Sequence, residues 1–229
     1  MLKKSGDAQN DEVNQCTETS DIPEMSEIDK AACEKIQQLQ DVTFHQTAKL
    51  YRAVMAYYRL QFGDHGGSSV FFNRNGKDFR YSLTDGVTGT MYVADSPLTA
   101  MKEVFQNKKG LKESDLDNYY LGTVVIGKDI KVVDVTALIR HSSLTLHNVT
   151  TADRRVTQLL AQKIQAAGFD GMEFPSNVTG EPCLVLWHNV PSGQGMATTQ
   201  NQTRLSDFVF NGREAADILV DQLGIPVDE

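Results

Sequence analysis

The sequence predicts a mixed α+β fold, and three observations carry that prediction. Short segments rich in β-branched and aromatic residues are bounded by glycine-containing turns, which is typical of β-strands. A few longer segments carry good helix formers behind a serine or threonine that can cap a helix. Strand and helix segments do not alternate regularly, so a doubly wound parallel sheet is not expected. With 40% hydrophobic residues, a chain of 229 residues can bury a substantial core.

The N-terminal part is predicted to consist of a tail and a helix. Residues 1–25 are polar and acidic with few large apolar side chains, so we expect them to be disordered. Residues 26–45 are expected to form a helical extension that begins with Ser26 as its cap. The apolar face of this helix would be formed by Ile28, Ala32, Ile36 and Leu39.

The central segments lead into a strand and a helix. Residues 50–60, LYRAVMAYYRL, fit a strand or a helix, because periodicity does not separate the two. Residues 63–79 form a glycine-rich loop that lacks the spacing of a P-loop or of a dinucleotide-binding loop. Residues 90–94 indicate a buried strand, and the helix after it is expected to be capped by Ser96 and to end at Gly110.

The second half of the chain contains further strand and helix signals. A helix is expected between a cap at Thr151 and an end at Gly168, and residues 191–229 are expected to form a linker and an amphipathic C-terminal helix. Strands are expected at 119–125, 130–135, 171–174 and 184–188, the first two joined by a turn at 127–129.

Composition and motif searches exclude several classes of function. A net charge of −8 argues against broad binding to nucleic acids or anionic membranes, so neither is expected as a partner. Three scattered cysteines without a CxxC motif indicate neither a disulfide framework nor a zinc site, and the histidines show no metal-binding pair. No G-x-S-x-G motif, signal peptide or membrane span is visible. We therefore expect a cytoplasmic protein without a bound metal.

Four sequence blocks, in this order, resemble the RES domain family, which is named for an arginine, a glutamate and a serine. Tyr51-Arg52 in KLYRAV is similar to the aromatic–arginine pair that opens the domain. Arg80-Tyr81 and the following GTMYVADSPLTAMKEV resemble its N-terminal half. GFDGMEFPSNV at 168–178, followed by CLVLW, resembles the block that carries the family's serine. By this resemblance, residues 46–190 are identified as a RES catalytic domain.

The resemblance implies a fold and a function. The expected fold is ADP-ribosyltransferase-like, a split, twisted mixed β-sheet with flanking helices and a cleft that holds NAD. The expected function is that of a bacterial toxin that breaks the nicotinamide–ribose bond of NAD, which is a substrate and not a cofactor. The expected partner is a cognate antitoxin or immunity protein that occludes the cleft. The segments outside the minimal domain would also suit a toxin delivered into the cytoplasm of another cell.

The resemblance assigns catalytic roles to Glu103, Arg80 and Tyr92. Cleavage of this bond develops positive charge on the ribose, so a carboxylate such as Glu103 can stabilise the transition state and hold the ribose hydroxyls. The guanidinium of Arg80 matches phosphate oxygens, and the ring of Tyr92 can stack against nicotinamide or ribose. Without the resemblance, Glu103 would be interpreted as solvated, Arg80 as part of a surface ion pair and Tyr92 as a core residue.

Five further residues are predicted to bind NAD: Tyr51, Arg52, Arg74, Tyr81 and Ser176. Arg52 matches the family's other arginine position, and Arg74 is an additional candidate for a phosphate. Tyr81 stands where many members carry tryptophan. Ser176 can hydrogen-bond a phosphate or ribose, or it can simply cap a turn after Pro175.

Two alternatives to NAD degradation remain open at the level of sequence. An ADP-ribosyltransferase would use the same cleft chemistry with a macromolecule as acceptor, in place of water or phosphate. A non-catalytic module would bind a nucleotide or a partner in the cleft without needing Glu103 for chemistry.

Overall fold

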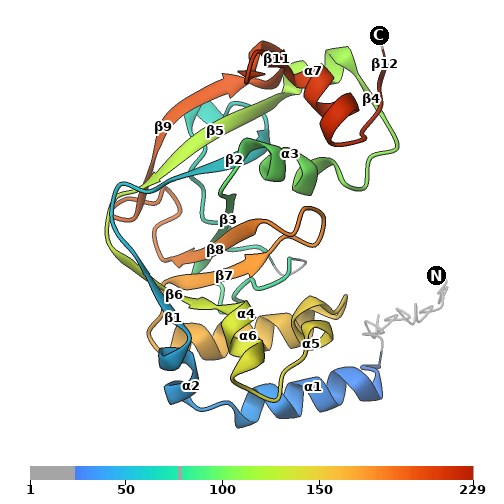
Figure 1. Cartoon of the computed structure of the whole chain (residues 1–229). Helices are drawn as coiled ribbons and strands as arrows, with labels where there is room; N and C mark the ends of the chain where they lie inside the picture. The colour runs from blue at the N-terminus through green and yellow to red at the C-terminus, as the bar shows by residue number, and fades with distance from the viewer. Residues whose placement is uncertain (1–23, 77–78, 229) are drawn as a thin grey trace, which may run out of the picture.

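A mixed β-sheet of eight strands dominates the computed structural model, which describes residues 24–76 and 79–228 (Figure 1). The predicted tail, residues 1–25, therefore lies almost entirely outside the described residues. Every neighbouring pair in the sheet is antiparallel except β6 with β7. Across the sheet the strands are β1 (Ala48–Tyr51), β6 (Ile130–Asp134), β7 (Gly171–Pro175), β8 (Pro182–His188), β3 (Gly89–Ala94), β2 (Ala56–Phe62), β5 (Tyr119–Ile126) and β9 (Ala197–Arg204).

The sheet is divided between β2 and β3. These two strands pair only at Tyr58 and Ala94, whereas β2 pairs with β5 along its whole length. Figure 1 shows β2, β5 and β9 diverging from the part formed by β1, β6, β7, β8 and β3. The prediction of a split, mixed sheet with flanking helices is thus confirmed.

The helices lie in two groups around the sheet (Figure 1). Helix α3 packs on β2 and β3, while α6 packs on β7 and contacts both α1 and α5. The helices are α1 (Glu27–Gln38), α2 (Asp41–Gln46), α3 (Pro97–Phe105), α4 (Val135–Arg140), α5 (Leu146–Thr150), α6 (Arg154–Ala166) and α7 (Ala215–Asp217). Shorter elements are η1 (His65–Gly67), η2 (Glu113–Asn118), η3 (Leu205–Asp207), η4 (Ile218–Gln222), β4 (Leu111–Lys112), β10 (Val209–Phe210), β11 (Arg213–Glu214) and β12 (Val227–Asp228).

Each face of the sheet is covered by its own hydrophobic core. Side chains alternate between the faces of a strand, so Val133 enters the larger core, which also contains the buried residues of α1, α3 and α6. Its neighbour Val132 enters the smaller core on the other face, against which Tyr51 packs. Tyr92 packs on the larger core and Val93 on the smaller one.

Helix α1 confirms part of the N-terminal prediction and corrects another part. Ser26 is the N-cap, its hydroxyl accepting from the Asp29 N–H at 3.1 Å, and Ala32 and Ile36 are buried. Ile28 was expected on the apolar face but is 61% exposed, so the buried side of α1 is formed by Ala32 and Ile36 without it.

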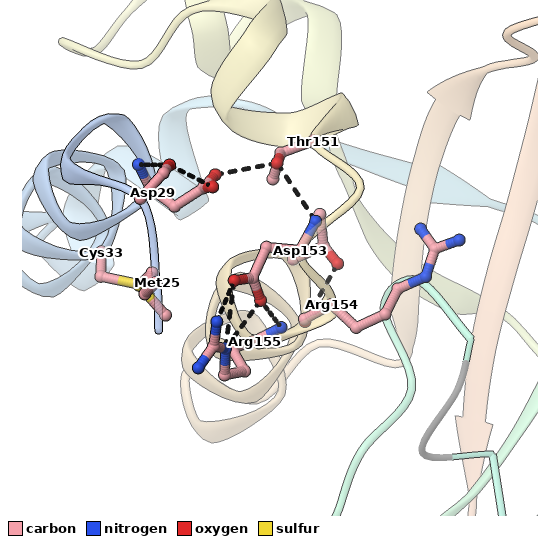
Figure 2. A network of polar contacts seen from close by, with 9 residues as sticks. Met25, Asp29, Cys33, Thr151, Asp153, Arg154 and Arg155 are labelled. Carbon is pink, nitrogen blue, oxygen red and sulfur yellow. Dashed lines mark hydrogen bonds and ion pairs between the residues drawn. The ribbon is translucent and has the colours of Figure 1, made fainter. Parts of the chain in front are cut away.

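Thr151 does not cap α6 as predicted. Its hydroxyl donates to Asp29 on α1 at 2.8 Å, and Asp153 takes the N-cap position, accepting from the Arg155 N–H at 3.0 Å (Figure 2). Arg155 also forms an ion pair with Asp153. The predicted end of this helix at Gly168 is confirmed by the positive φ of 86° that this glycine adopts.

Two other expectations on secondary structure were wrong, and a third was confirmed. Helix α3 ends at Phe105 rather than Gly110. The side-chain amide of Gln106 donates a hydrogen bond to the Glu103 carbonyl at 2.8 Å, and the Lys108 N–H donates to the Phe105 carbonyl, which forms a turn in place of a further helical turn. The strands expected at 119–125 and 130–135 are confirmed as β5 and β6, which pair with other strands and not with each other. The expected linker contains β9, whose polar residues suit an exposed sheet edge.

The predicted C-terminal helix is present as a short helical segment after a hairpin. Asn211 and Gly212 both have positive φ and make the turn of the β10–β11 hairpin, which precedes this helical segment. Only α7 and the π-helical η4 remain helical there, and they bury Ile218 and Leu219.

Candidate functional site

A cavity of about 470 Å³ lies where the sheet divides, on the face that carries the larger core. It is lined by parts of β2 and β3, by α3 and by the first residue of α6. Its aromatic lining residues are Tyr58, Phe79, Tyr81, Tyr92 and Phe174. Its charged and amide-bearing lining residues are Arg59, Arg80, Glu103, Gln106, Asn107 and Arg154.

Helix α3 carries Glu103 to the cavity wall. Ser96 caps the helix, its hydroxyl accepting from the Thr99 N–H at 3.1 Å, and Pro97 occupies the first turn. Burial of Met101 and Phe105 against β2 and β3 fixes the rotation of the helix and turns Glu103 toward the cavity.

Ser176 holds one carboxylate oxygen of Glu103. Its hydroxyl donates to Glu103 Oε1 at 2.6 Å, while Gln106 donates to Oε2 at 3.2 Å. The Ser176 oxygen itself accepts from the N–H groups of Val178 and Thr179 at 3.2 and 3.1 Å. With only 3% of its surface exposed, Ser176 is fixed in this position, and the carboxylate has little freedom to rotate.

Arg80 joins the same loop through the residue after the serine. The side-chain amide of Asn177 is oriented so that both its oxygen and its nitrogen have suitable hydrogen-bond partners. In this orientation the Asn177 oxygen accepts from Arg80 Nη1 and Nη2, each at 2.9 Å. The signature arginine, glutamate and serine are therefore linked through one short loop that follows β7.

The backbone at Tyr81 is in the left-handed region, with φ 61°, a conformation that costs a tyrosine of order 1–3 kcal/mol. Its surroundings fix it there. The Tyr81 hydroxyl donates to the Val149 carbonyl at 2.5 Å, and its own carbonyl accepts from Trp187 Nε1 at 3.0 Å. Burial raises the pKa of Tyr81 to about 12, against the positive charge of Arg80. The turn directs the preceding Arg80 into the cavity.

Tyr92 forms the aromatic wall together with Phe79 and Phe174. The Tyr92 ring lies 6.4 Å from each of these rings, measured between centroids. Burial raises the pKa of Tyr92, and the side chain of Ser82 acts against that rise. The phenol is therefore neutral at physiological pH and offers an uncharged aromatic face.

Tyr51, Arg52 and Arg74 are not among the lining residues of this cavity. Tyr51 packs on the other face of the sheet and donates to Glu173. The Arg52 side chain is 74% exposed and pairs with Asp129 at 2.7 Å. Arg74 donates to the Asn189 carbonyl at the surface. The NAD contacts predicted for these residues thus stay predictions, while Glu103, Arg80, Tyr92, Tyr81 and Ser176 come together.

Sequence reasoning missed several lining residues of the cavity, among them Tyr58, Phe79 and Arg154. Tyr58 lay in the segment for which strand and helix were both open, so the direction of its side chain could not be derived. Arg154 begins α6, and the sequence carries no signal that brings the start of this helix to Arg80.

Within the described parts of the chain, no cluster of three His, Cys, Asp or Glu residues is arranged to hold a metal ion. No helix among the same residues has the length and apolar character that a membrane span requires.

Comparisons with known proteins agree with this geometry. The family model described as the RES domain matches residues 50–207. The crystal structure of the M. tuberculosis MbcT–MbcA toxin–antitoxin complex contains a chain with a similar fold, with a TM-score of 0.54 and 18% sequence identity. The similarity covers 78% of this chain and 93% of that chain. A search among curated proteins gives no match.

Proposed function

Because the chain belongs to the RES domain family, we propose that it is a toxin that depletes NAD by cleaving the bond between nicotinamide and ribose. One observation carries the proposal: Ser176 fixes Glu103 at the wall of a cavity that Arg80 and Tyr92 also line. The ribosyl group is transferred to water or to phosphate.

The arrangement suits the charge that develops in this reaction. Nicotinamide leaves without prior protonation, so positive charge builds up on the ribose ring. A carboxylate whose position is already fixed stabilises that charge without reorganising, and one such group contributes roughly 3–4 kcal/mol to catalysis. Glu103 meets this requirement, since Ser176 and Gln106 each donate a hydrogen bond to one of its oxygens.

The remaining groups bind other parts of the substrate. Arg80 supplies a planar, permanently charged donor for the pyrophosphate, and the neutral ring of Tyr92 supplies a surface for nicotinamide or ribose. The cavity lies at the division of the sheet and has an exposed rim that includes Phe79, which is 55% exposed.

The partner that we propose is an antitoxin or immunity protein that covers this opening. A toxin–antitoxin complex contains the similar fold, which supports this choice. We further propose that the protein acts in the cytoplasm, where NAD is available to it.

The test measures NAD over time with the purified protein, with and without added phosphate, and follows both nicotinamide and the ribosyl product. The Glu103→Gln variant removes only the charge and should lower turnover about 100- to 1000-fold. Glu34→Gln is the matched control, because Glu34 also lies within a helix but is exposed on α1, far along the chain from the cavity residues.

Each outcome has a distinct meaning. Loss of NAD that requires Glu103 supports the proposal, and the product identifies water or phosphate as the acceptor. Transfer of label from NAD to a macromolecule would point to an ADP-ribosyltransferase instead. NAD that persists with folded protein, free of inhibitor, would contradict the proposal and favour a non-catalytic binding module.

A further inference from the structure

Arg154 is a further cation in the cavity, and the proposed reaction assigns it no role. It is the first residue of α6, and it lines the same cavity as Arg80. Its neighbour Arg155 pairs with Asp153, but Arg154 extends away from those contacts (Figure 2). Among the described residues, none forms an ion pair with Arg154.

Two nitrogens of these arginines are shielded from solvent and lack an acceptor. Arg154 Nη1 and Arg80 Nε are both buried, and no group in the described part of the chain accepts a hydrogen bond from either. A buried donor without a partner costs about 1–3 kcal/mol, and more when it is charged. Such donors indicate a ligand that the cavity is shaped to receive.

The charges around the cavity also favour an anion. The chain as a whole has a net charge of −8, yet the described residues that line the cavity include Arg59, Arg80 and Arg154 against the single carboxylate of Glu103. The guanidinium of Arg59 donates to the Ser69 carbonyl at 2.9 Å, so it already has a partner. Arg80 and Arg154 repel one another unless a negative group lies between them.

The two arginines act on the same groups. Burial raises the pKa of Tyr81 and of Tyr92, and the positive charges of Arg80 and Arg154 both act against that rise. Both arginines also line the same cavity as Tyr81 and Tyr92, one from the segment before β3 and the other from α6.

We propose that Arg154 and Arg80 together form an anion subsite that binds a phosphate group, with Arg154 Nη1 and Arg80 Nε as the donors that lack an acceptor among the described residues. The proposal rests on the proposed function for the source of that phosphate, which is either the pyrophosphate of the dinucleotide or free inorganic phosphate that accepts the ribosyl group. Arginine suits the role, because its fork matches the oxygens of a phosphate and it stays charged at every relevant pH.

The experiment measures binding, so it does not depend on turnover. The full chain and its Arg154→Gln variant are titrated by calorimetry with ADP-ribose, with inorganic phosphate and with adenosine. Loss of a charged hydrogen bond should raise the Kd for the phosphate-bearing ligand about tenfold to hundredfold and leave adenosine binding unchanged. Arg155→Gln is the matched control, since it removes the same charge from the next residue and should leave all three affinities unchanged.

The ligands distinguish the two sources of phosphate. A weaker affinity for ADP-ribose assigns the subsite to the pyrophosphate, and a weaker affinity for inorganic phosphate alone assigns it to the acceptor. Arg154→Lys keeps the charge without the fork and should give an intermediate loss, so it serves if Arg154→Gln does not fold. Affinities that change in neither variant, with thermal unfolding as in the wild type, would overturn the proposal.

The result is separable from the proposed function. If the wild-type protein binds ADP-ribose through Arg154 but leaves NAD intact, the anion subsite stands and the proposed reaction fails. If the wild-type protein cleaves NAD but Arg154→Gln binds phosphate-bearing ligands as tightly as the wild type does, the proposed reaction stands and the anion subsite fails.

Discussion

At the scale of single residues, the carboxylate of Glu103 is positioned by neighbours and not by its own helix alone. Ser176 is buried and donates to this carboxylate, so it acts as a positioning residue for the proposed reaction. The cost of losing such a hydrogen bond to a charged group is about 1.5–3 kcal/mol.

Ser176→Ala should therefore lower kcat about tenfold to hundredfold, with a smaller effect on KM, because the carboxylate is bound less firmly when charge develops. Steady-state kinetics of NAD loss measure this split. Ser206→Ala is the matched control, since Ser206 also donates to a carboxylate, Asp117, at 2.6 Å but is exposed and lies outside the cavity. Equal losses in both variants would show that the effect is not positional.

The sequence allowed the signature residues to be chosen but not their contacts. The four blocks around Arg52, Arg80, Glu103 and Ser176 supported the family, and the structure brings the last three together. The Arg52 side chain instead pairs with Asp129 at the surface. The motif could not predict this, because the position of a residue in a motif does not determine the face of the sheet to which its side chain turns. Arg154 could not be found, because its approach to Arg80 depends on how α6 packs.

At the scale of elements, caps determine where the helices begin. The capping residues of α1 and α3, Ser26 and Ser96, were predicted correctly, because each serine directly precedes a helical pattern. At α6 the sequence analysis chose Thr151, but in the structure Thr151 contacts Asp29 and Asp153 takes the N-cap position. Such a choice depends on a residue distant in the chain, and local sequence does not contain it.

The N-cap of α6, Asp153, leads to a prediction about how the stability of the fold depends on pH. The hydrogen bond and charge of Arg155 hold the pKa of Asp153 below its ordinary value, against a smaller effect of burial. A carboxyl with a lowered folded pKa adds stability above its unfolded pKa of about 3.9, and that contribution is lost as the pH falls through the folded pKa. Asp153→Asn keeps a good cap and removes only the charge.

Urea unfolding at a series of pH values measures the effect. The wild type should be more stable than Asp153→Asn at neutral pH, and the difference should shrink as the pH falls below about 4. In an Arg155→Gln background the difference at neutral pH should be much smaller, because the partner is gone. A difference that is independent of pH would contradict this account.

At the scale of the whole molecule, the N-terminal helix belongs to the main core although the RES match begins at residue 50. Ile36 of α1 is fully buried, and α1 is joined to α6 through Asp29 with Thr151 and through Lys163 with the Gln37 carbonyl at 2.7 Å. The mixed fold class was predictable from segment types. The order of strands was not, because pairing partners are distant in the chain.

Ile36→Ala should lower the free energy of unfolding by about 2–5 kcal/mol, since it leaves a cavity in the core. The matched control is Ile28→Ala in the same helix, where the side chain is 61% exposed and the change should stay within about 0.5 kcal/mol. Chemical denaturation measures both. Equal, small effects would show that α1 is an appendage and not part of the core.

The place of β8 in the sheet has a consequence for synthesis of the protein. This strand, Pro182–His188, lies between β7 and β3, so neither neighbour can complete its pairing before β8 has left the ribosome. The contact between Glu103 and Ser176 likewise joins positions 73 residues apart. A growing chain therefore carries no assembled site until most of it has been translated. The complete site therefore first forms on a nearly finished protein, and the antitoxin proposed above would have its binding surface only from that stage on.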